Sequence, residues 1–345
     1  MHERRLWSNL GYAVVAFMTF ALLWHLLSTP PTLSPLGDAF TVYTHNSTVF
    51  TYPFQLLDPS DYNRLIDIGF NFTISNFVCN ETSPLLLVLV HTAPTNFAKR
   101  RTIRETWGQE VEGVKIVFMV GSVNSPELQK TLEDENRKYG DFVQGSFLDT
   151  YRNITYKHVM ALKYTIYHCP QAKYILKTDD DVFVNMPAMT NFLKFDLSPY
   201  GASRVLFCTP RRHANVLRSY RSKWRVSFQE YPNRTYPTYC PGWSLLYSPD
   251  VIFALYCEAQ VSEYFWIDDI HITGTLTERI NVKHTDIEFL VISFKNLRNI
   301  VDFDYNVTEP FLYGRSDLEE RQIRGLWRYV TTHSVPKSIL KDLQY

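Results

Sequence analysis

Between residues 84 and 181, apolar runs of strand length alternate with amphipathic stretches of helix length. Strictly alternating strands and helices form a mainly parallel sheet flanked by helices, in which ligands bind at the carboxyl ends of the strands. The pattern therefore predicts an α/β fold. The predicted strands cover residues 85–90, 114–120, 141–147 and 174–176, and the predicted helices cover 96–107, 127–139 (stopped by Gly140) and 153–169.

The composition excludes two broad classes of protein. The chain has 345 residues, of which 45% are hydrophobic, so it can bury a large core and is not disordered throughout. Its 35 basic and 35 acidic side chains give a formal net charge of zero. Nucleic acid is therefore not an expected partner, because nucleic-acid binders depend on an excess of positive charge.

Residues 10–27 form an apolar run without Asp, Glu, Lys or Arg, nearly long enough to span a bilayer as a helix. Arg4 and Arg5 precede the run, and the next basic residue is Arg64, which keeps the amino end in the cytosol. We expect a cytosolic tail over 1–9 and a transmembrane signal anchor over 10–27. A cleaved signal peptide is the alternative, but the run is longer than usual and no small-x-small cleavage site follows it.

This topology places residues 28–345 in the secretory lumen. A proline-rich segment, 28–83, is expected to form a luminal stem and domain edge, followed by a folded domain over 84–345. Five cysteines allow at most two disulfides and leave one thiol, and the sequence does not choose the pairing. No paired Cys-x-x-Cys spacing suggests zinc. Six glycosylation sequons fit the luminal placement: Asn46, Asn71, Asn80, Asn153, Asn233 and Asn306.

An acidic triplet, Asp179, Asp180 and Asp181, follows the last predicted strand. In isolation such a triplet favours a solvated acidic turn or a helix cap. Here it lies between two apolar segments, 174–176 and 182–184, and adjacent carboxylates repel one another unless a cation offsets their charge. Hard oxygen ligands suit Mg²⁺ or Mn²⁺, which keep open positions for phosphate oxygens. The triplet therefore predicts a divalent metal site at a strand end.

From about Cys79 onward the chain resembles the β1,3-galactosyltransferase family, which also contains β1,3-N-acetylglucosaminyltransferases. A lone Asp-x-Asp would say little, but seven motifs of the family occur here in the same order. They are residues 100–108 (RRTIRETWG), 118–121 (FMVG), 149–157 (DTYRNITYK), 177–181 (KTDDD), 223–227 (KWRVS), 236–242 (YPTYCPG) and 267–270 (IDDI).

The resemblance implies a GT-A fold, with 84–345 as the catalytic glycosyltransferase domain, and a Golgi type II membrane enzyme. It implies Mn²⁺-dependent, inverting transfer of galactose from UDP-galactose, in β1,3 linkage, to an acceptor sugar on a glycoprotein or glycolipid. One alternative of the same class is a β1,3-N-acetylglucosaminyltransferase that uses UDP-GlcNAc. Another, of a different class, is an inactive luminal lectin or scaffold, which would be expected to lack the metal or base carboxylates.

By motif position, the resemblance makes Asp181 the ligand of Mn²⁺, with Asp179 and Asp180 helping to hold the water shell of the metal. Asp179 and Asp180 are also expected to bind the donor at its ribose. The family has a second ligand, a histidine near the carboxyl end, and His333 is the nominee, with His284 as a weaker rival. On spacing alone, an ordinary surface or core histidine describes His333 almost as well.

The same comparison makes Asp269 the catalytic base, with Asp268 tuning its charge; the alternative is that the pair caps a helix over 270–279. Arg104 and Lys157 are expected to neutralise the donor diphosphate or to fix a carboxylate such as Asp149. A solvated helix face explains either basic residue nearly as well. Two departures from the family are a bulky Trp243-Ser244-Leu245 and a longer interval between Asp269 and His333.

Overall fold

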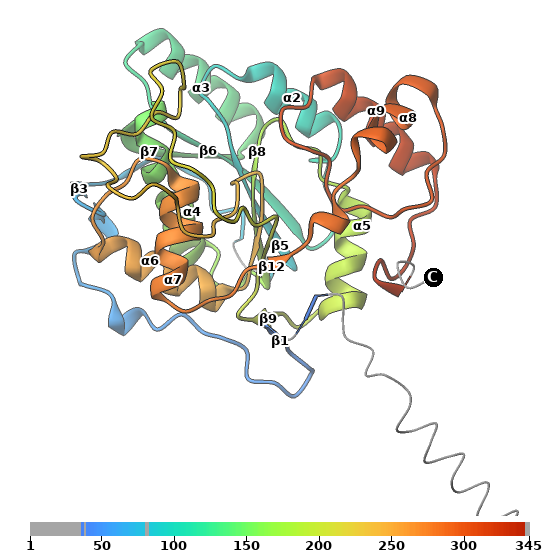
Figure 1. The fold of residues 1–345 in the computed structure, drawn as a ribbon, viewed down its shortest axis with the longest axis horizontal. Helices are drawn as coiled ribbons and strands as arrows, with labels where there is room; N and C mark the ends of the chain where they lie inside the picture. Colours follow the sequence, from blue (N-terminus) through green and yellow to red (C-terminus); the bar gives the residue numbers. More distant parts are fainter. Residues whose placement is uncertain (1–35, 38, 80–82, 342–345) are drawn as a thin grey trace, which may run out of the picture. The chain divides into compact units, whose positions relative to one another are not determined.

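A computed structural model describes residues 36–37, 39–79 and 83–341 (Figure 1). The predicted tail and anchor, residues 1–27, and the Asn80 sequon lie outside the described residues. Within the described part of the chain, no helix is long and apolar enough to cross a membrane. The described residues from Ala39 onward belong to one compact unit, Ala39–Tyr345.

The centre of the fold is an eight-stranded sheet with the order β12-β10-β11-β8-β5-β6-β7-β4. Its four middle strands, β8, β5, β6 and β7, run parallel, whereas β11 and β4 pair antiparallel on either side of them. The strands are β4 (Phe72–Ser75), β5 (Leu86–His91), β6 (Val114–Ser122), β7 (Phe142–Leu148), β8 (Tyr174–Asp179), β10 (Leu206–Cys208), β11 (Ser244–Tyr247) and β12 (Thr285–Asp286). Two small antiparallel pairs join β1 (Thr41–Val42) to β9 (Ala202–Ser203), and β2 (Arg64–Leu65) to β3 (Ile68–Gly69).

Helices flank this sheet, as the alternating pattern predicts (Figure 1). They are α2 (Phe97–Glu105), α3 (Pro126–Tyr139), α4 (Ile154–His168), α5 (Met186–Asn191), α6 (Pro249–Val261), α7 (Thr277–Arg279), α8 (Phe294–Phe303) and α9 (Glu320–Thr332). Shorter turns are η1 (Phe54–Leu56), η2 (Asp61–Asn63), η3 (Tyr151–Asn153) and η6 (Glu288–Leu290), and wider π-helical turns are η4 (Phe192–Leu197) and η5 (Asp269–Leu276). The predicted α/β class with a mainly parallel sheet core is confirmed.

Local sequence explains where these elements begin and end. Helix α3 starts after Ser125, whose hydroxyl accepts a hydrogen bond from the Leu128 N–H at 3.1 Å, and it ends at Gly140 with a φ of 64°. Strand β5 is buried along its whole length, which is typical of a central parallel strand covered on both faces. The end of α3 at Gly140 confirms the predicted stop.

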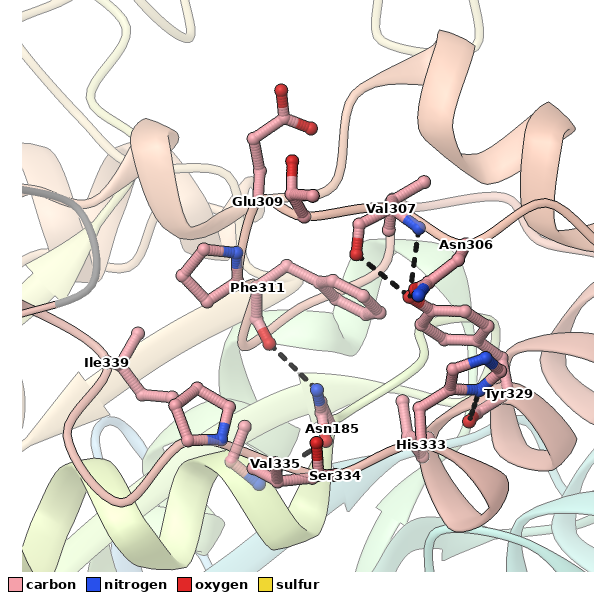
Figure 2. A pocket seen from close by; sticks show the side chains of 15 residues that line it. Asn185, Asn306, Val307, Glu309, Phe311, Tyr329, His333, Ser334, Val335 and Ile339 are labelled. Carbon is pink, nitrogen blue, oxygen red and sulfur yellow. Dashed lines mark hydrogen bonds between the residues drawn. The ribbon is translucent and has the colours of Figure 1, made fainter. Parts of the chain in front are cut away.

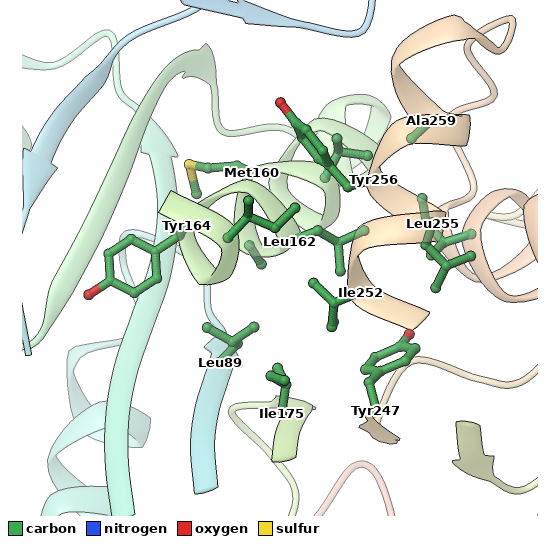
Figure 3. Packing of buried hydrophobic residues seen from close by; sticks show 14 of the residues in the cluster. Leu89, Met160, Leu162, Tyr164, Ile175, Tyr247, Ile252, Leu255, Tyr256 and Ala259 are labelled. Carbon is green, nitrogen blue, oxygen red and sulfur yellow. The ribbon is translucent and has the colours of Figure 1, made fainter. Parts of the chain in front are cut away.

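The main hydrophobic core lies between the sheet and two packed helices, α4 and α6 (Figure 3). Leu162 of α4 and Ile252 of α6 pack with Leu89, Ile175 and Tyr247 of strands β5, β8 and β11. These buried side chains hold the three strands in one rigid sheet. The strand ends that carry the acidic residues are fixed by this packing.

Two disulfides join Cys79 to Cys169 and Cys208 to Cys240, and Cys257 is the free thiol. The prediction of at most two bridges and one leftover cysteine is confirmed. The first disulfide ties Cys169, directly after α4, to the segment between β4 and β5. Strand β4, within the segment predicted to be stem and domain edge, forms the edge of the main sheet beside β7.

Candidate active site

A pocket of about 690 Å³ opens at the carboxyl ends of the parallel strands. Strand β5 ends at His91 and its neighbour β8 ends at Asp179, and these two residues pair in register. Asp149 directly follows β7, so the chain leaves three parallel strands at the same edge of the sheet. This is the edge at which open α/β sheets bind ligands.

Six aspartates predicted from the sequence, a seventh aspartate and four lysines line this pocket. The aspartates are Asp149, Asp179, Asp180, Asp181, Asp268 and Asp269, joined by a seventh, Asp317, from the loop before α9; the lysines are Lys99, Lys157, Lys177 and Lys223. The structure thus brings together seven of the predicted site residues: the six aspartates and Lys157. Such a mixture of charges suits a ligand that carries phosphate groups together with a cation.

Within the acidic triplet, Asp180 is the residue already committed to protein partners. Its Oδ2 accepts hydrogen bonds from Thr92 Oγ1 at 2.6 Å and Asn96 Nδ2 at 2.7 Å. The Lys99 ammonium lies 3.1 Å from a carboxylate oxygen of Asp180 and 3.1 Å from one of Asp181. The side chain of Asp181 is otherwise free of hydrogen bonds and ion pairs among the described residues. The position between Asp180 and Asp181 therefore accepts positive charge.

Asp179 is paired with Lys177 of its own strand. The Lys177 Nζ lies 2.8 Å from Asp179 Oδ1 and donates to the Gly242 carbonyl at 2.7 Å. Burial raises the pKa of Asp179, and the Lys177 charge opposes that rise. A Cβ at Gly242 would lie 2.5 Å from Asp269 Oδ1 and closer still to Lys177 Nζ, so any larger residue here would displace the ends of these two side chains.

Asp268 and Asp269 occupy different environments although they are adjacent. Asp268 is 3% exposed and its Oδ2 lies 2.9 Å from Nδ1 of the buried His158 on α4. Burial would raise the pKa of Asp268, but the His158 hydrogen bond and the Lys177 charge lower it below its ordinary value. Burial, together with the negative charge of Asp268, raises the pKa of Asp269 well above its ordinary value.

The different environments make Asp269 the better proton acceptor of the pair. The helix-capping alternative is not supported, since no side chain caps η5, the turn that starts at Asp269. Asp268 is instead bound to His158.

Asp149 and Lys157 form an ion pair on the floor of the pocket. The Lys157 Nζ lies 2.9 Å from Asp149 Oδ2 and donates to the Thr92 carbonyl at 2.8 Å. Asp149 Oδ2 also accepts a hydrogen bond from the Gly121 N–H at 2.6 Å. Lys157 therefore fixes Asp149, as one of its two predicted roles requires, while both side chains face the pocket.

Arg104 does not line this pocket, so the structure does not place it where the predicted role on the donor diphosphate would require. Its guanidinium binds both carboxylate oxygens of Asp141 at 2.7 and 2.9 Å and one oxygen of Glu135 at 2.7 Å. It also lies 4.0 Å from the ring centre of Tyr139. These contacts join α2 to α3 and to the start of β7. Arg104 is a structural residue here.

His333 also lies apart from the acidic triplet, in a separate pocket of about 430 Å³ (Figure 2). Its Nδ1 is 2.9 Å from the Tyr329 carbonyl, and its ring stacks on Tyr329 with centroids 4.3 Å apart. The position directly after α9 explains this: the imidazole turns back onto its own helix end. The rival, His284, does not line the acidic pocket either: its Nε2 lies 2.6 Å from the Thr273 carbonyl oxygen.

Sequence reasoning missed several residues of the pocket. Thr92, Asn96 and Lys99 hold the acidic triplet, and His158 holds Asp268. His158 follows directly after Lys157 of a quoted motif, but no spacing connects it to a residue 110 positions later. Asp317, in the loop that donates the Leu318 N–H to the Asp181 carbonyl at 2.9 Å, gave no signal because it stands outside every motif.

Comparison with known proteins agrees with the pocket chemistry. The family model described as Galactosyltransferase matches residues 98–288. Beta-1,3-galactosyltransferase 5 of Gorilla gorilla gorilla is 34% identical over 209 residues, covering 59% of this chain and 69% of the relative. Beta-1,3-galactosyltransferase 1 of Mus musculus is 30% identical over 270 residues, covering 76% of this chain and 80% of the relative.

Among solved structures, a galactosyltransferase LgtC in complex with donor and acceptor sugar analogs is 12% identical, with a TM-score of 0.35. The match covers 72% of this chain and 97% of that one, a likeness too distant to bear on function. The match to the family model, in contrast, spans the acidic triplet and the Asp268–Asp269 pair. The chain therefore belongs to the galactosyltransferase family, among the β1,3-galactosyltransferases.

Proposed function

We propose that this protein is an inverting GT-A enzyme that transfers galactose from UDP-galactose, with Mn²⁺, in β1,3 linkage to an acceptor sugar of a glycoprotein or glycolipid. The observation that carries the proposal is the convergence of the acidic triplet and Asp269 in one pocket with four lysines. A metal-binding group and a general base in the same cleft are what transfer from a nucleoside diphosphate sugar requires.

The residues present suit a divalent metal. The donor set consists of carboxylate oxygens, which Mg²⁺ and Mn²⁺ prefer. Lys99 places its ammonium between Asp180 and Asp181, where positive charge is accepted. No group of three or more His, Cys, Asp or Glu side chains in the described residues is arranged to hold a metal by itself. Few protein ligands are expected where substrate phosphates and waters complete the coordination.

We assign the metal to Asp181, with Asp179 in its water shell and Asp317 as the second carboxylate in place of His333. Asp317 lines the same pocket, and its side chain makes no hydrogen bond or ion pair with any described residue. Bound Mn²⁺ would offset the negative charge that develops on the departing diphosphate. Lys157 and Lys223 lie in the pocket wall, where they add positive charge for the phosphates.

Asp269 then serves as the base. Its carboxylate takes the proton of the acceptor hydroxyl as that oxygen bonds to the anomeric carbon of galactose. The bond from the anomeric carbon to the phosphate oxygen breaks on the opposite face, and its electron pair leaves with UDP. One carboxylate is sufficient, because a diphosphate leaving group needs no proton donor. Asp268, held by His158, keeps its negative charge beside Asp269.

Trp243 supports galactose, in place of N-acetylglucosamine, as the sugar that this enzyme transfers. This residue lines the pocket, is 8% exposed and stands edge-on to Tyr313 with ring centroids 6.4 Å apart. A rigidly packed indole leaves less room for an acetamido group than a small residue would. An inactive lectin is disfavoured, since both the triplet and Asp269 are present and share the pocket.

The proposed site of action is the Golgi membrane, with a single amino-terminal span and a luminal catalytic domain. The apolar run at 10–27 and the basic residues before it support this topology. The two disulfides of the folded unit also support it, because such bonds persist in the secretory lumen and are rare in the cytosol.

A donor screen tests the proposed function. The purified full-length protein is incubated with UDP-galactose, UDP-GlcNAc and UDP-glucose, with simple β-linked sugar acceptors, and with or without Mn²⁺. We expect galactose transfer that requires Mn²⁺, with the product in β configuration. Transfer of N-acetylglucosamine at the higher rate would refute the donor assignment, and full activity in a chelator would refute the metal assignment.

The Asp268–Asp269 pair also predicts the pH dependence of transfer. A plot of kcat/KM against pH should rise as the pH passes the pKa of Asp269, because the base acts only when ionised. Replacing Asp268→Asn removes a charge that raises the pKa of Asp269, so the rising limb should move to lower pH. The control is Asp286→Asn on the edge strand β12, which should leave the limb in place. An unchanged limb in Asp268→Asn would contradict the coupling.

A further inference from the structure

A second cavity, of about 280 Å³, is lined in part by the same base. Asp269, Trp224 and Pro241 line both this cavity and the acidic pocket. Asp269 therefore faces two spaces of different size. A volume below the ~300–1,000 Å³ of pockets for drug-sized ligands suits a single sugar ring better than a nucleotide sugar.

The wall of this second cavity is aromatic and apolar. Trp224, Tyr236 and Tyr239 line it together with Leu217 and Ile267. Trp224 is itself stacked on Trp266, with the two planes 13° apart, so its ring is held in a fixed orientation. Rigid aromatic faces with a few polar groups are typical of small-ligand sites, and they suit the C–H face of a sugar.

Tyr236 supplies a polar group that the fold leaves unused. Its side chain is 8% exposed, and its hydroxyl is buried without a hydrogen-bond partner among the described residues. Burying a hydroxyl without a partner costs about 1–3 kcal/mol, so such a group in a binding cavity points to a ligand. The ring of Tyr236 packs against Tyr231 and Tyr239, which holds it at the cavity wall.

We propose that this cavity, here called the acceptor cleft, binds the terminal sugar ring of the acceptor and presents one of its hydroxyls to Asp269. The inference rests on the proposed function, because it takes Asp269 as the base and the acidic pocket as the donor site. It assigns Trp224 of the 223–227 motif, and Tyr236 and Tyr239 of the 236–242 motif, to acceptor binding. The Tyr236 hydroxyl pairs with a polar atom of the bound sugar.

A variant that fills the cleft tests this assignment. Leu217 lines the cleft but is 45% exposed, so Leu217→Trp narrows the cavity without burying a larger side chain in the core. The matched control is Tyr220→Trp in the same loop, because Tyr220 is 87% exposed and does not line the cleft. Full-length enzymes are assayed with UDP-galactose and with aryl β-galactoside and aryl β-N-acetylglucosaminide acceptors.

We expect Leu217→Trp to raise the acceptor KM at least ~10-fold, the equivalent of about 1.4 kcal/mol of binding, and to leave the KM for UDP-galactose unchanged. Tyr220→Trp should match the wild type in both constants. Tyr236→Phe keeps the ring and should raise the acceptor KM ~3–10-fold, as expected for one lost hydrogen bond. An unchanged acceptor KM in Leu217→Trp, or an equal rise in the donor KM, overturns the proposal.

Saccharide binding without turnover separates this inference from the proposed function. The same acceptor glycosides are titrated into each protein in the presence of UDP and Mn²⁺. If the wild type transfers no sugar yet binds a glycoside that Leu217→Trp does not bind, the proposed function fails and the cleft stands as a saccharide-binding site. If transfer occurs but both proteins bind equally, the cleft assignment fails. Neither transfer nor binding by the wild type would overturn both.

Discussion

Replacing Asp269→Asn should reduce galactose transfer by ~100-fold or more, the usual contribution of a positioned general base. Asparagine has nearly the same size and retains hydrogen bonding, but it cannot accept the proton of the acceptor hydroxyl. Binding of UDP-galactose should survive, because the proposed metal ligands Asp181 and Asp317 are unchanged in this variant. Transfer rates and donor titration of the same preparation measure both effects.

Asp268→Asn is the matched comparison, since it changes the neighbouring carboxylate in the same way. We expect a milder loss, because asparagine still pairs with His158 and Asp269 remains available. If the two aspartates mattered only for helix structure, both variants would keep their activity, since asparagine is a good capping residue. Wild-type transfer by Asp269→Asn would show that another group is the base.

The parts of the fold that the sequence predicted correctly are those set by local pattern. Residues 85–90 read as an apolar run, and they form β5 with only a one-residue shift, to Leu86–His91. Gly140 ends α3 because glycine adopts a φ of 64° without strain. The triplet was placed at a strand end because the apolar run before it stops there, and β8 does end at Asp179. Periodicity and turn chemistry suffice for such features.

Interactions between distant segments were not accessible in this way. A motif position suggested Arg104 for the donor, but the guanidinium is satisfied by Asp141 and Glu135, 37 and 31 positions away. The sequence spacing of Arg104, Glu135 and Asp141 does not distinguish an arginine that pairs with carboxylates from one that contacts a phosphate. Lys99 was overlooked for the same reason: its partners, Asp180 and Asp181, are 81 and 82 positions away.

The position of His333 shows the limit of comparison by motif. His333 was nominated across a gapped interval, and the described fold places it against Tyr329 at the end of α9. The loop that reaches the triplet is instead the one before α9, where Leu318 N–H binds the Asp181 carbonyl. That backbone contact brings Asp317 into the pocket wall. This contact joins residues 137 positions apart in the sequence, so no motif spacing reveals it.

Asp181→Asn should weaken Mn²⁺ binding by more than the ~10–100-fold that loss of an outer-shell partner costs, and should abolish nearly all transfer. The reason is that asparagine offers a neutral oxygen where Asp181 offers a charged one. Calorimetric titration of Mn²⁺ into the protein in the presence of UDP measures the Mn²⁺ affinity without relying on turnover. Asp181 is partly exposed and, among the residues that the structure describes, has only Lys99 as its side-chain partner, so the fold should be retained.

Lys99→Met provides the opposing control for the same measurement. Lys99 Nζ lies 3.1 Å from both Asp180 and Asp181, so its charge competes with a cation for the Asp181 carboxylate. Removing that ammonium should tighten Mn²⁺ binding, whereas Asp181→Asn should weaken it. Opposite shifts in Mn²⁺ affinity would place the metal at Asp181. Only a cation bound there loses a competing charge in Lys99→Met and loses its ligand in Asp181→Asn. Normal Mn²⁺ affinity and turnover in folded Asp181→Asn would remove the metal from this residue.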